Sequence, residues 1–456
     1  MRVEKDFIGE VEIPDDVYYG IHTYRALNNF PNTGEKLNNS FIWAFFMIKK
    51  AAAILNFELG YLNENEKNAI VQACDEWESL KNHIVVDPLS GGAGTSINMN
   101  INEVIANRAT EILGGKKSEY IIDPLDQVNM HQSTNDVFPT AGKVAIIKEL
   151  RELVENVIKL QDSIQVKEKE YIKIRKIGRT QLMDAVPILL GQEFGAWADT
   201  LSRDRWRLYK VEERIRSVNI GGTAIGTGIA APKEYILKIV NKVREITKIG
   251  IAKAENLIDA TQNLDVFSEV SGLLKSLAVN LVKISNDIRV LGSNAVNEIK
   301  LPKIQAGSSI MPGKVNPVIP EYVIQLSTSV ISFDNLITYA SSMGNLELNH
   351  LTPMIIHYTL KSIDFLKKAT YSLKNYIELI QPNEEKCHEN LVKSFTLVTP
   401  LIEIFGYNEV SESLKENNFD IEKTVKDLSK KRNFDFKEIM NKINSNRSAG
   451  LGYRLK

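Results

Sequence analysis

The chain contains 456 residues, 43% of them hydrophobic, and its 56 Lys and Arg nearly balance its 57 Asp and Glu. This length corresponds to about three typical domains, and the apolar content is sufficient for a large core. Because the net charge is only −1, no global basic field favours nucleic acid. We therefore expect no nucleic-acid partner and only local sites for anions.

The N-terminal residues and the cysteines bear on location and on metals. Residues 1–6 are charged rather than apolar, and the most apolar early run, 41–48, is too short for a membrane span. We expect no export signal, no membrane segment and a cytoplasmic location. Cys74 and Cys387 belong to no Cys/His cluster, and the six histidines show no metal-ligand spacing, so we expect no catalytic metal.

In chain order, the N-terminal part is expected to combine short helices and loops with a β-prone stretch at 11–13. Apolar residues then recur every three or four positions, which predicts long helices over 140–173, 233–249, 262–292 and 318–343. The charged C-terminal part has the pattern of shorter helices, at 420–429 and 435–443. The predicted fold is mainly α, in three domains: 1–135, 136–388 (a long-helix bundle) and 389–456.

The predicted helix at 262–292 bears on the oligomeric state. A helix of about 30 residues spans roughly 45 Å, which is longer than a compact domain requires. Its apolar positions also spread wider than one surface stripe. We therefore expect the long helices to pack in a bundle that includes helices of other subunits.

Four polar segments stand at predicted turns or helix starts: 94–100, 131–136, 178–181 and 307–317. Their hydroxyl and amide side chains donate hydrogen bonds to carboxylates, and Lys314 adds a positive charge. The pattern favours a small polyanionic acid over a nucleotide, because there is no Walker loop and Gly221–Gly226 lacks a flanking βαβ pattern. Ordinary roles stay open: residues 133–136 have the composition of a helix cap, and 307–317 that of a connector.

The segment 307–316 reads Gly-Ser-Ser-Ile-Met-Pro-Gly-Lys-Val-Asn and matches the pattern GSSxMPxKxN. Together with the other three polar segments in this order, it resembles the aspartase/fumarase superfamily over nearly the whole chain, from residue 4 to residue 349. Three features are closer to the ammonia-lyases of that superfamily than to its class II fumarases. They are Tyr-Tyr-Gly-x-His-Thr-x-Arg-Ala at 18–26, the threonine in Ser133-Thr134-Asn135, and Gln181 in place of a histidine.

The resemblance implies a homotetramer with a shared helical bundle, in which each active site combines segments of three subunits. The implied reaction is the reversible deamination of L-aspartate to fumarate and ammonia, without a cofactor. Ser308 is implied to be the general base, as an alkoxide, forming an enediolate intermediate, with Ser309 in support. The residues implied to bind the carboxylates or the amino group are Thr95, Ser133, Thr134, Asn135, Thr180, Gln181, Lys314 and Asn316. Glu321 is implied to pair with Gln181 or a water.

Other readings stay open. A class II fumarase would release water from L-malate, and a related lyase would act on an N-substituted aspartate. A non-catalytic oligomer of the same fold is a third reading, against which the intact polar loop argues. The chain departs from the family's usual residues at His350, at Thr352 and over 393–401. These positions lie outside the four polar segments, so they bear on stability or fine substrate preference more than on the reaction type.

Overall fold

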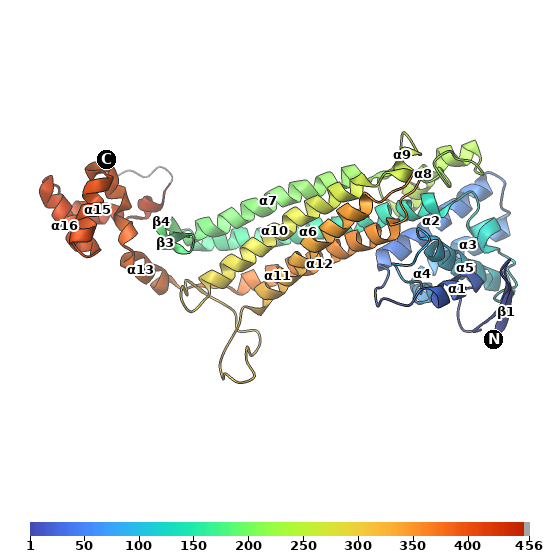
Figure 1. Cartoon of the computed structure of the whole chain (residues 1–456), viewed down its shortest axis with the longest axis horizontal. Helices are drawn as coiled ribbons and strands as arrows, with labels where there is room; N and C mark the ends of the chain where they lie inside the picture. Colours follow the sequence, from blue (N-terminus) through green and yellow to red (C-terminus); the bar gives the residue numbers. More distant parts are fainter. Residues whose placement is uncertain (451–456) are drawn as a thin grey trace. The chain divides into compact units, whose positions relative to one another are not determined.

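The computed structural model describes residues 1–450, most of which are helical (Figure 1). The helices are α1 Ile21–Asn29, α2 Asn39–Glu58, α3 Glu64–Asp75, α4 Trp77–Leu80, α5 Thr95–Ile112, α6 Thr134–Tyr171, α7 Leu190–Ile215, α8 Lys233–Thr247, α9 Asp259–Gln262, α10 Asp265–Leu291, α11 Val318–Ser341, α12 Thr352–Leu379, α13 Glu384–Lys393, α14 Ile402–Phe405, α15 Tyr407–Glu416, α16 Ile421–Lys431 and α17 Phe436–Ile443. Short 3-10 or π turns lie at Lys81–His83, Pro124–Val128, Phe395–Leu401 and Asn446–Ala449.

The strands are short and form two-stranded sheets. They are β1 Arg2–Lys5, β2 Glu10–Ile13, β3 Arg175–Thr180, β4 Met183–Leu189, β5 Ser217–Val218, β6 Ala252–Lys253, β7 Ile299–Lys300 and β8 Gln381–Pro382. The pairs β1–β2, β3–β4 and β7–β8 are antiparallel, and β5–β6 is parallel. The expected mainly α fold is confirmed, and the predicted long helices correspond to α6, α8, α10 and α11. Two more long helices, α7 and α12, lie outside the segments that the periodicity singled out.

The described residues group into two compact units. Unit 1 comprises 1–155, 206–279 and 327–367, and unit 2 comprises 156–205, 280–326 and the residues from 368 onward. The helices α6, α7, α10, α11 and α12 contribute residues to both units. The division into three domains at 135 and 388 stays a prediction, and residues 451–456 of its last domain lie outside the described part.

In unit 1, α2 is a core helix that packs on α3 and α8 (Figure 1). Its Phe41 and Phe45 are almost fully buried and meet the ring of Phe138 in α6, with centroid distances of 5.0 and 5.7 Å. In the part of the chain that the structure describes, α2 is also the one helix long and apolar enough to cross a membrane. Because 78% of that window is buried inside the protein, the composition is that of a core helix.

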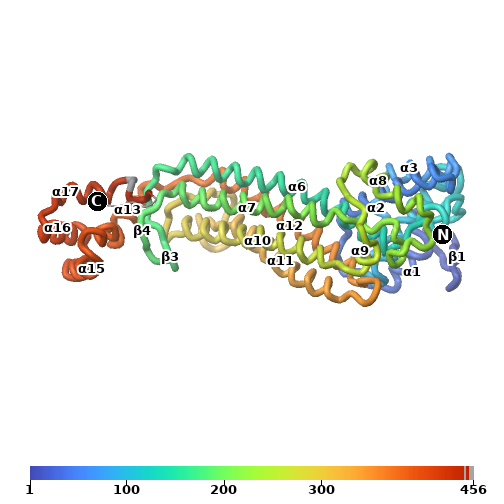
Figure 2. The backbone as a smooth tube through the Cα atoms, turned by 90° about the horizontal axis from the view of Figure 1, so that it is seen from above, coloured from blue at the N-terminus to red at the C-terminus, as the bar shows by residue number. Residues whose placement is uncertain are grey.

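In unit 2, a buried ion network fixes the β3–β4 hairpin. Lys176 Nζ lies 2.6 Å from Glu193 Oε1 and 3.0 Å from Glu298 Oε2, and both Lys176 and Glu298 are almost inaccessible to solvent. Further along the chain, α15, α16 and α17 gather around a small apolar core (Figure 2). That core includes Val410, Leu428 and Ile439.

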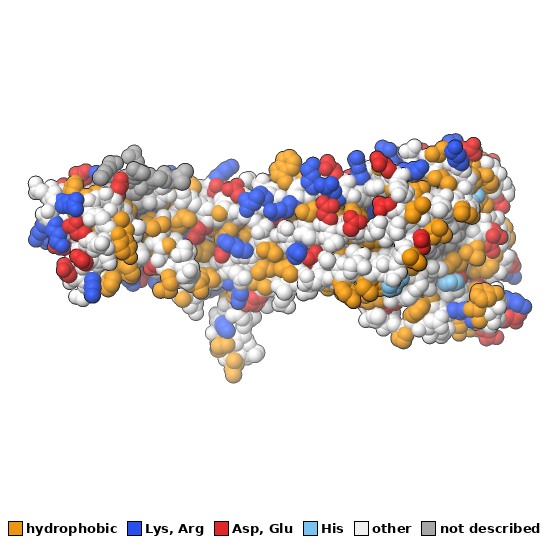
Figure 3. Space-filling model, turned by 45° about the horizontal axis from the view of Figure 1, so that its top comes forward, with side chains coloured by type: hydrophobic (Ala, Val, Ile, Leu, Met, Phe, Trp, Pro, Cys, Tyr) orange, Lys and Arg blue, Asp and Glu red, His pale blue; other side chains and the backbone are white. Residues whose placement is uncertain are grey.

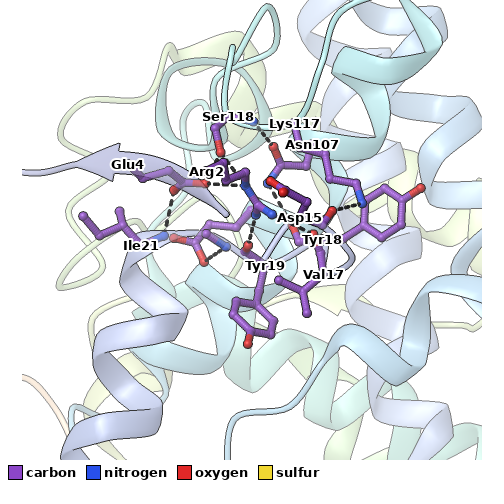
Figure 4. A network of polar contacts seen from close by, with 12 residues as sticks. Arg2, Glu4, Asp15, Val17, Tyr18, Tyr19, Ile21, Asn107, Lys117 and Ser118 are labelled. Carbon is purple, nitrogen blue, oxygen red and sulfur yellow. Dashed lines mark hydrogen bonds and ion pairs between the residues drawn. The ribbon is translucent and has the colours of Figure 1, made fainter. Parts of the chain in front are cut away.

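The segment before α1 is fixed by two side chains of β1 (Figure 4). The Arg2 guanidinium donates hydrogen bonds to the carbonyl oxygens of Tyr19 at 2.6 Å and Val17 at 3.1 Å. Glu4 accepts a hydrogen bond from the backbone N–H of Ile21 at 2.8 Å, at the start of α1. These contacts hold the Tyr-Tyr-Gly segment against β1.

Glu103 of α5 caps the N-terminus of α1. Its carboxylate accepts hydrogen bonds from the backbone N–H groups of Gly20 at 2.9 Å, His22 at 2.8 Å and Thr23 at 3.2 Å. Burial raises the pKa of Glu103 to about 7, although these hydrogen bonds favour the charged form. A Cβ atom at Gly20 would lie 2.8 Å from Glu4 Oε2 and 3.0 Å from the Glu103 carboxyl carbon. Glycine is therefore the residue that fits between the two carboxyl groups.

Asp6→Asn is expected to lower the free energy of unfolding by about 1 kcal/mol at pH 7, the upper range for a partly exposed ion pair. Arg25 donates to both carboxylate oxygens of Asp6 at 2.7 Å and holds the pKa of Asp6 at about 2. A carboxyl group whose pKa falls on folding contributes stability above its unfolded pKa, near 3.8, and loses it as the pH falls towards 2. In urea denaturation, the gap between wild type and variant should therefore be smaller at pH 3 than at pH 7.

Glu10→Gln is the control for this measurement. Glu10 pairs with Lys5 at 3.3 Å, but both side chains are more than half exposed, so the pair contributes little. Its replacement should leave the urea midpoint almost unchanged at both pH values. An Asp6→Asn effect as large at pH 3 as at pH 7 would contradict the lowered pKa of Asp6.

Candidate active site

The first polar segment forms the turn before α5 and the first turn of that helix. Gly94 has a φ of +94°, and a Cβ atom there would lie 2.6 Å from the ring of Phe138. Both the backbone conformation and the close approach of α6 therefore require glycine. Thr95 follows as the first residue of α5 and is exposed. It stands where free backbone N–H groups and the helix dipole favour an anion.

The second polar segment begins α6, and part of it acts as a helix cap. Ser133 Oγ accepts a hydrogen bond from the backbone N–H of Asn135 at 3.2 Å, and Asp136 Oδ1 accepts one from the N–H of Ser133 at 3.1 Å. Ser133 is therefore the N-cap of α6, with its hydroxyl on the N–H of the second helical residue and the Asp136 side chain on its own N–H. Simple capping therefore accounts for Ser133 and Asp136, but not for the side chains of Thr134 and Asn135.

The Thr134 side chain joins the first two polar segments. It is only 8% exposed, and its Oγ1 accepts a hydrogen bond from Nδ2 of Asn98 in α5 at 3.0 Å. Because Asn98 supplies that donor, the hydroxyl hydrogen of Thr134 is free to donate to another acceptor, such as a carboxylate. Thr95, Ser133, Thr134 and Asn135 thus lie at the adjoining N-terminal ends of α5 and α6 in unit 1.

Behind Thr134 lies a buried polar cluster that the sequence analysis missed. Asn129 Oδ1 accepts hydrogen bonds from Lys49 Nζ at 2.9 Å, and from Asn98 and Asn102 at 3.2 Å each. Lys49 is completely buried, and burial lowers its pKa to about 7. Its protonated form adds positive charge beside a group that could bind an anion. In the sequence, Lys49 stood only at the end of an apolar run, and no local pattern signals its burial.

A second missed element is the glycine loop, residues 219–231, which packs on the start of α6. Asp136 Oδ2 accepts hydrogen bonds from the backbone N–H groups of Gly221 at 3.1 Å and Thr223 at 2.7 Å. Burial raises the pKa of Asp136 to about 6, and its backbone hydrogen bonds oppose that increase. Asn135 Nδ2 in turn donates to the carbonyl oxygen of Ala224 at 2.8 Å. In the sequence, the loop lacks the flanking pattern of a cofactor site, and no local feature links it to residues 131–136.

The third polar segment lies on the β3–β4 hairpin of unit 2. Gln181 and Leu182 join the strands with φ values of +54° and +63°, which is typical of a type I′ turn. Thr180 and Gln181 are exposed at this tip. Arg179 has a structural role, because its guanidinium makes two 2.9 Å hydrogen bonds to the buried Glu298 carboxylate. The hairpin therefore presents an exposed tip on a fixed base.

The fourth polar segment belongs to the long loop between α10 and α11, which stands away from the helices of unit 2 (Figure 1). The backbone N–H of Gly307 donates to the carbonyl oxygen of Lys314 at 2.8 Å, and Asn316 Nδ2 donates to that of Gly307 at 2.7 Å. These bonds close the base of the loop. Figure 3 shows hydrophobic side chains at its tip, where Ile310 is 84% exposed.

Ser308 is held by its own loop. Its Oγ accepts hydrogen bonds from the backbone N–H groups of Ile310 at 3.2 Å and Met311 at 2.8 Å. Two donors on one hydroxyl oxygen favour negative charge there. Lys314 is exposed in the same loop. Ser308 and Lys314 line one open hollow of about 530 Å³, whereas Gln181 lines another, of about 410 Å³.

The remaining predicted residues have less specific surroundings. Ser309 is exposed beside Ser308. Glu321 lies in the first turn of α11, and burial together with the negative charge of Glu321 raises the pKa of Tyr376 to about 12. No hydrogen bond between Glu321 and Gln181 occurs among the described residues, so that pairing stays a prediction. In the same part of the chain, no group of three or more His, Cys, Asp or Glu side chains is arranged to hold a metal ion.

Comparisons with known proteins agree with the resemblance. The sequence pattern that defines the lyase family matches residues 9–332. The curated aspartate ammonia-lyase of Bacillus subtilis is 44% identical over 422 residues, which cover 91% of this chain and 89% of that protein. Further curated aspartate ammonia-lyases, including that of Helicobacter pylori, show similar identity.

Solved structures give the same result. One described as fumarate lyase:delta crystallin, from Brucella melitensis, is 41% identical and superposes with a TM-score of 0.92 over 98% of this chain and 99% of its own. A class II fumarase from Schistosoma mansoni is 29% identical, with a TM-score of 0.92 over 99% of this chain and 100% of its own. The chain therefore belongs to the lyase family of the aspartase/fumarase superfamily.

Proposed function

We propose that this chain is an aspartate ammonia-lyase, which interconverts L-aspartate with fumarate and ammonia. The observation that carries the proposal is the Ser308 hydroxyl, which lies in an exposed loop and accepts hydrogen bonds from two backbone N–H groups. The 44% identity to an aspartate ammonia-lyase, against 29% to a class II fumarase, supports ammonia rather than water as the leaving group.

The reaction must remove a proton from a carbon next to a carboxylate, which is a very weak carbon acid. Ser308 acts as the base in its alkoxide form, and the N–H groups of Ile310 and Met311 stabilise that charge. The proton moves from the β-carbon to Ser308 Oγ, and the electron pair left behind is delocalised onto the β-carboxylate as an enediolate. The bond between the α-carbon and nitrogen then breaks, nitrogen takes the bonding pair, and fumarate and ammonia result.

The other polar groups bind the substrate, and no cofactor takes part. Hydroxyl groups donate to the two carboxylates, Lys314 supplies a positive charge that Asn316 orients, and Ser309 supports the base. Asn135 and Gln181 face the amino group. The hydroxyl groups in question are those of Thr95, Ser133, Thr134 and Thr180.

We further propose that the active enzyme is a homotetramer, in which each active site combines segments of three subunits. The exposed tips of the hairpin and the loop support this assembly, since an exposed tip on a fixed base suits a site completed by a neighbouring subunit.

The purified protein is expected to release fumarate from L-aspartate, detected by the ultraviolet absorbance of fumarate. L-malate, tested in parallel, should give no fumarate. The carboxylate-binding groups would hold it, but the carboxamides of Asn135 and Gln181 are not suited to assist loss of its hydroxyl group. Fumarate from L-malate alone would make the protein a fumarase. If neither substrate gave fumarate, N-substituted aspartates would be tested next.

Ser308→Ala is expected to lower kcat by about 10²–10⁴-fold, the range for loss of a positioned base. The KM for L-aspartate should change little, because other residues bind the carboxylates. Ser79→Ala is a suitable control, since Ser79 is an exposed serine of α4 in unit 1. Gel filtration of each variant should give the wild-type size. Retention of kcat in Ser308→Ala would remove Ser308 from the role of base.

Mixing two inactive variants tests the shared site. Thr134→Val disables a group of unit 1 and Ser308→Ala one of unit 2. If the two groups of one site come from different subunits, dissociating and reassembling an equal mixture should restore about a quarter of the wild-type activity, because random assembly pairs two intact groups in that fraction of sites. Each variant reassembled alone is the control. No recovery in the mixture would place Thr134 and Ser308 of each site in the same subunit.

A further inference from the structure

The glycine loop is held in one conformation by Asp136. Each Asp136 oxygen accepts backbone hydrogen bonds, Oδ1 from Ser133 in the α6 cap and Oδ2 from Gly221 and Thr223 in the loop. The carboxylate is completely buried. A carboxylate suits this position because it only accepts hydrogen bonds, and all three facing groups are donors.

The conformation of the loop is strained, which indicates that its surroundings determine it. Thr223 has a φ of +50°, which is unfavourable for a β-branched residue. Its backbone N–H binds Asp136, and its Oγ1 donates to the carbonyl oxygen of Ile229 at 2.8 Å. At Gly226, a Cβ atom would lie 2.4 Å from the backbone of Ile258, so the loop also packs tightly on the next segment. A single loop shape is therefore maintained despite the strain.

This loop fixes the Asn135 carboxamide. Asn135 Nδ2 donates to the carbonyl oxygen of Ala224, which lies between Thr223 and Gly226. Since a carbonyl oxygen can only accept, the NH2 side of the carboxamide must face the loop. Its Oδ1 is then the side available to a ligand. Asn219 Nδ2 also binds the backbone carbonyl of Asn135 at 3.0 Å, so backbone and side chain are both held from the same loop.

We propose that Asp136, by holding the glycine loop under Asn135, is the positioning residue that makes the active site select a primary amino group. The inference rests on the proposed function. A carboxamide oxygen accepts a hydrogen bond from an amino group and repels another acceptor. Each substituent on nitrogen replaces one N–H and needs space beside Asn135, where the loop backbone stands. A rigid loop thus favours ammonia over a substituted amine.

The test uses the amination of fumarate by ammonia and by methylamine, compared in wild type and Asp136→Asn. In the variant an amide NH2 must face either the Ser133 N–H or the two loop N–H groups, so the loop is released or the cap is broken. The ratio of kcat/KM for methylamine to that for ammonia should rise by about tenfold or more. Any change in fumarate binding affects the reactions of both amines equally at saturating fumarate, so the ratio reports the contact with the amine alone.

Glu103→Gln is the matched control. Glu103 is also a buried carboxylate of unit 1 that accepts three backbone N–H groups, but it caps α1 and lies outside the polar segments. Its replacement should lower the thermal midpoint and leave the amine ratio unchanged. A general loss of folded enzyme would lower both rates equally and would not change the ratio, so the ratio separates positioning from stability.

A second variant covers the case in which Asp136→Asn does not fold. Thr223→Gly removes the bond to Ile229 and relieves the positive φ, and should shift the ratio in the same direction by a smaller factor. An unchanged ratio in the folded variants, or methylamine product absent from all of them, would overturn the proposal. Absence of any reaction between fumarate and ammonia in the wild type would instead overturn the proposed function.

Discussion

The hydrogen bonds to the buried carboxylate of Asp136 are the constraint on which the arrangement of unit 1 around the second polar segment depends. Three backbone N–H groups from two separate segments point at its two oxygens. Removing such a charge from water is favourable only when its hydrogen bonds are complete, so the site tolerates little displacement. Thr134 and Asn135 occupy the two positions before Asp136. The requirements of a buried charge therefore fix the groups that would meet the substrate.

The same principle applies in unit 2, where buried charges fix the base of an exposed segment. Arg179 and Lys176 both bind the carboxylate of Glu298, and this places the β3–β4 hairpin while leaving Gln181 exposed at the turn. The loop after α10 is closed by Asn316 in a similar way, with neutral groups. Charged side chains that face solvent are arranged differently from these buried ion pairs. Acidic and basic groups are interspersed on the face seen in Figure 3, as expected for a net charge near zero.

The helices and the polar segments were predictable from the sequence because both have local signals. Apolar spacing predicted α6, α8, α10 and α11, and the run of glycines, hydroxyl groups and amides marked the turns. The cluster around Lys49 and the support of Asn135 by Ala224 were not predictable in this way. Each is a contact between segments far apart in the chain, and a lysine after an apolar run has the same local pattern whether it is buried or solvated. The capping of α6 by Ser133 was foreseen only as an alternative to binding, and the structure shows that the cap and the candidate site occupy the same turn.

The two N–H groups on Ser308 come from the residues that follow it in the same loop. The Ser308 hydroxyl and its two donors therefore form one local unit, closed by the hydrogen bond from Asn316 to Gly307. Any movement of the loop that preserves this bond carries the oxygen and its donors together. In the proposed mechanism, the donors that stabilise the Ser308 alkoxide are thus supplied by the loop itself. These donors are therefore in place before any substrate arrives.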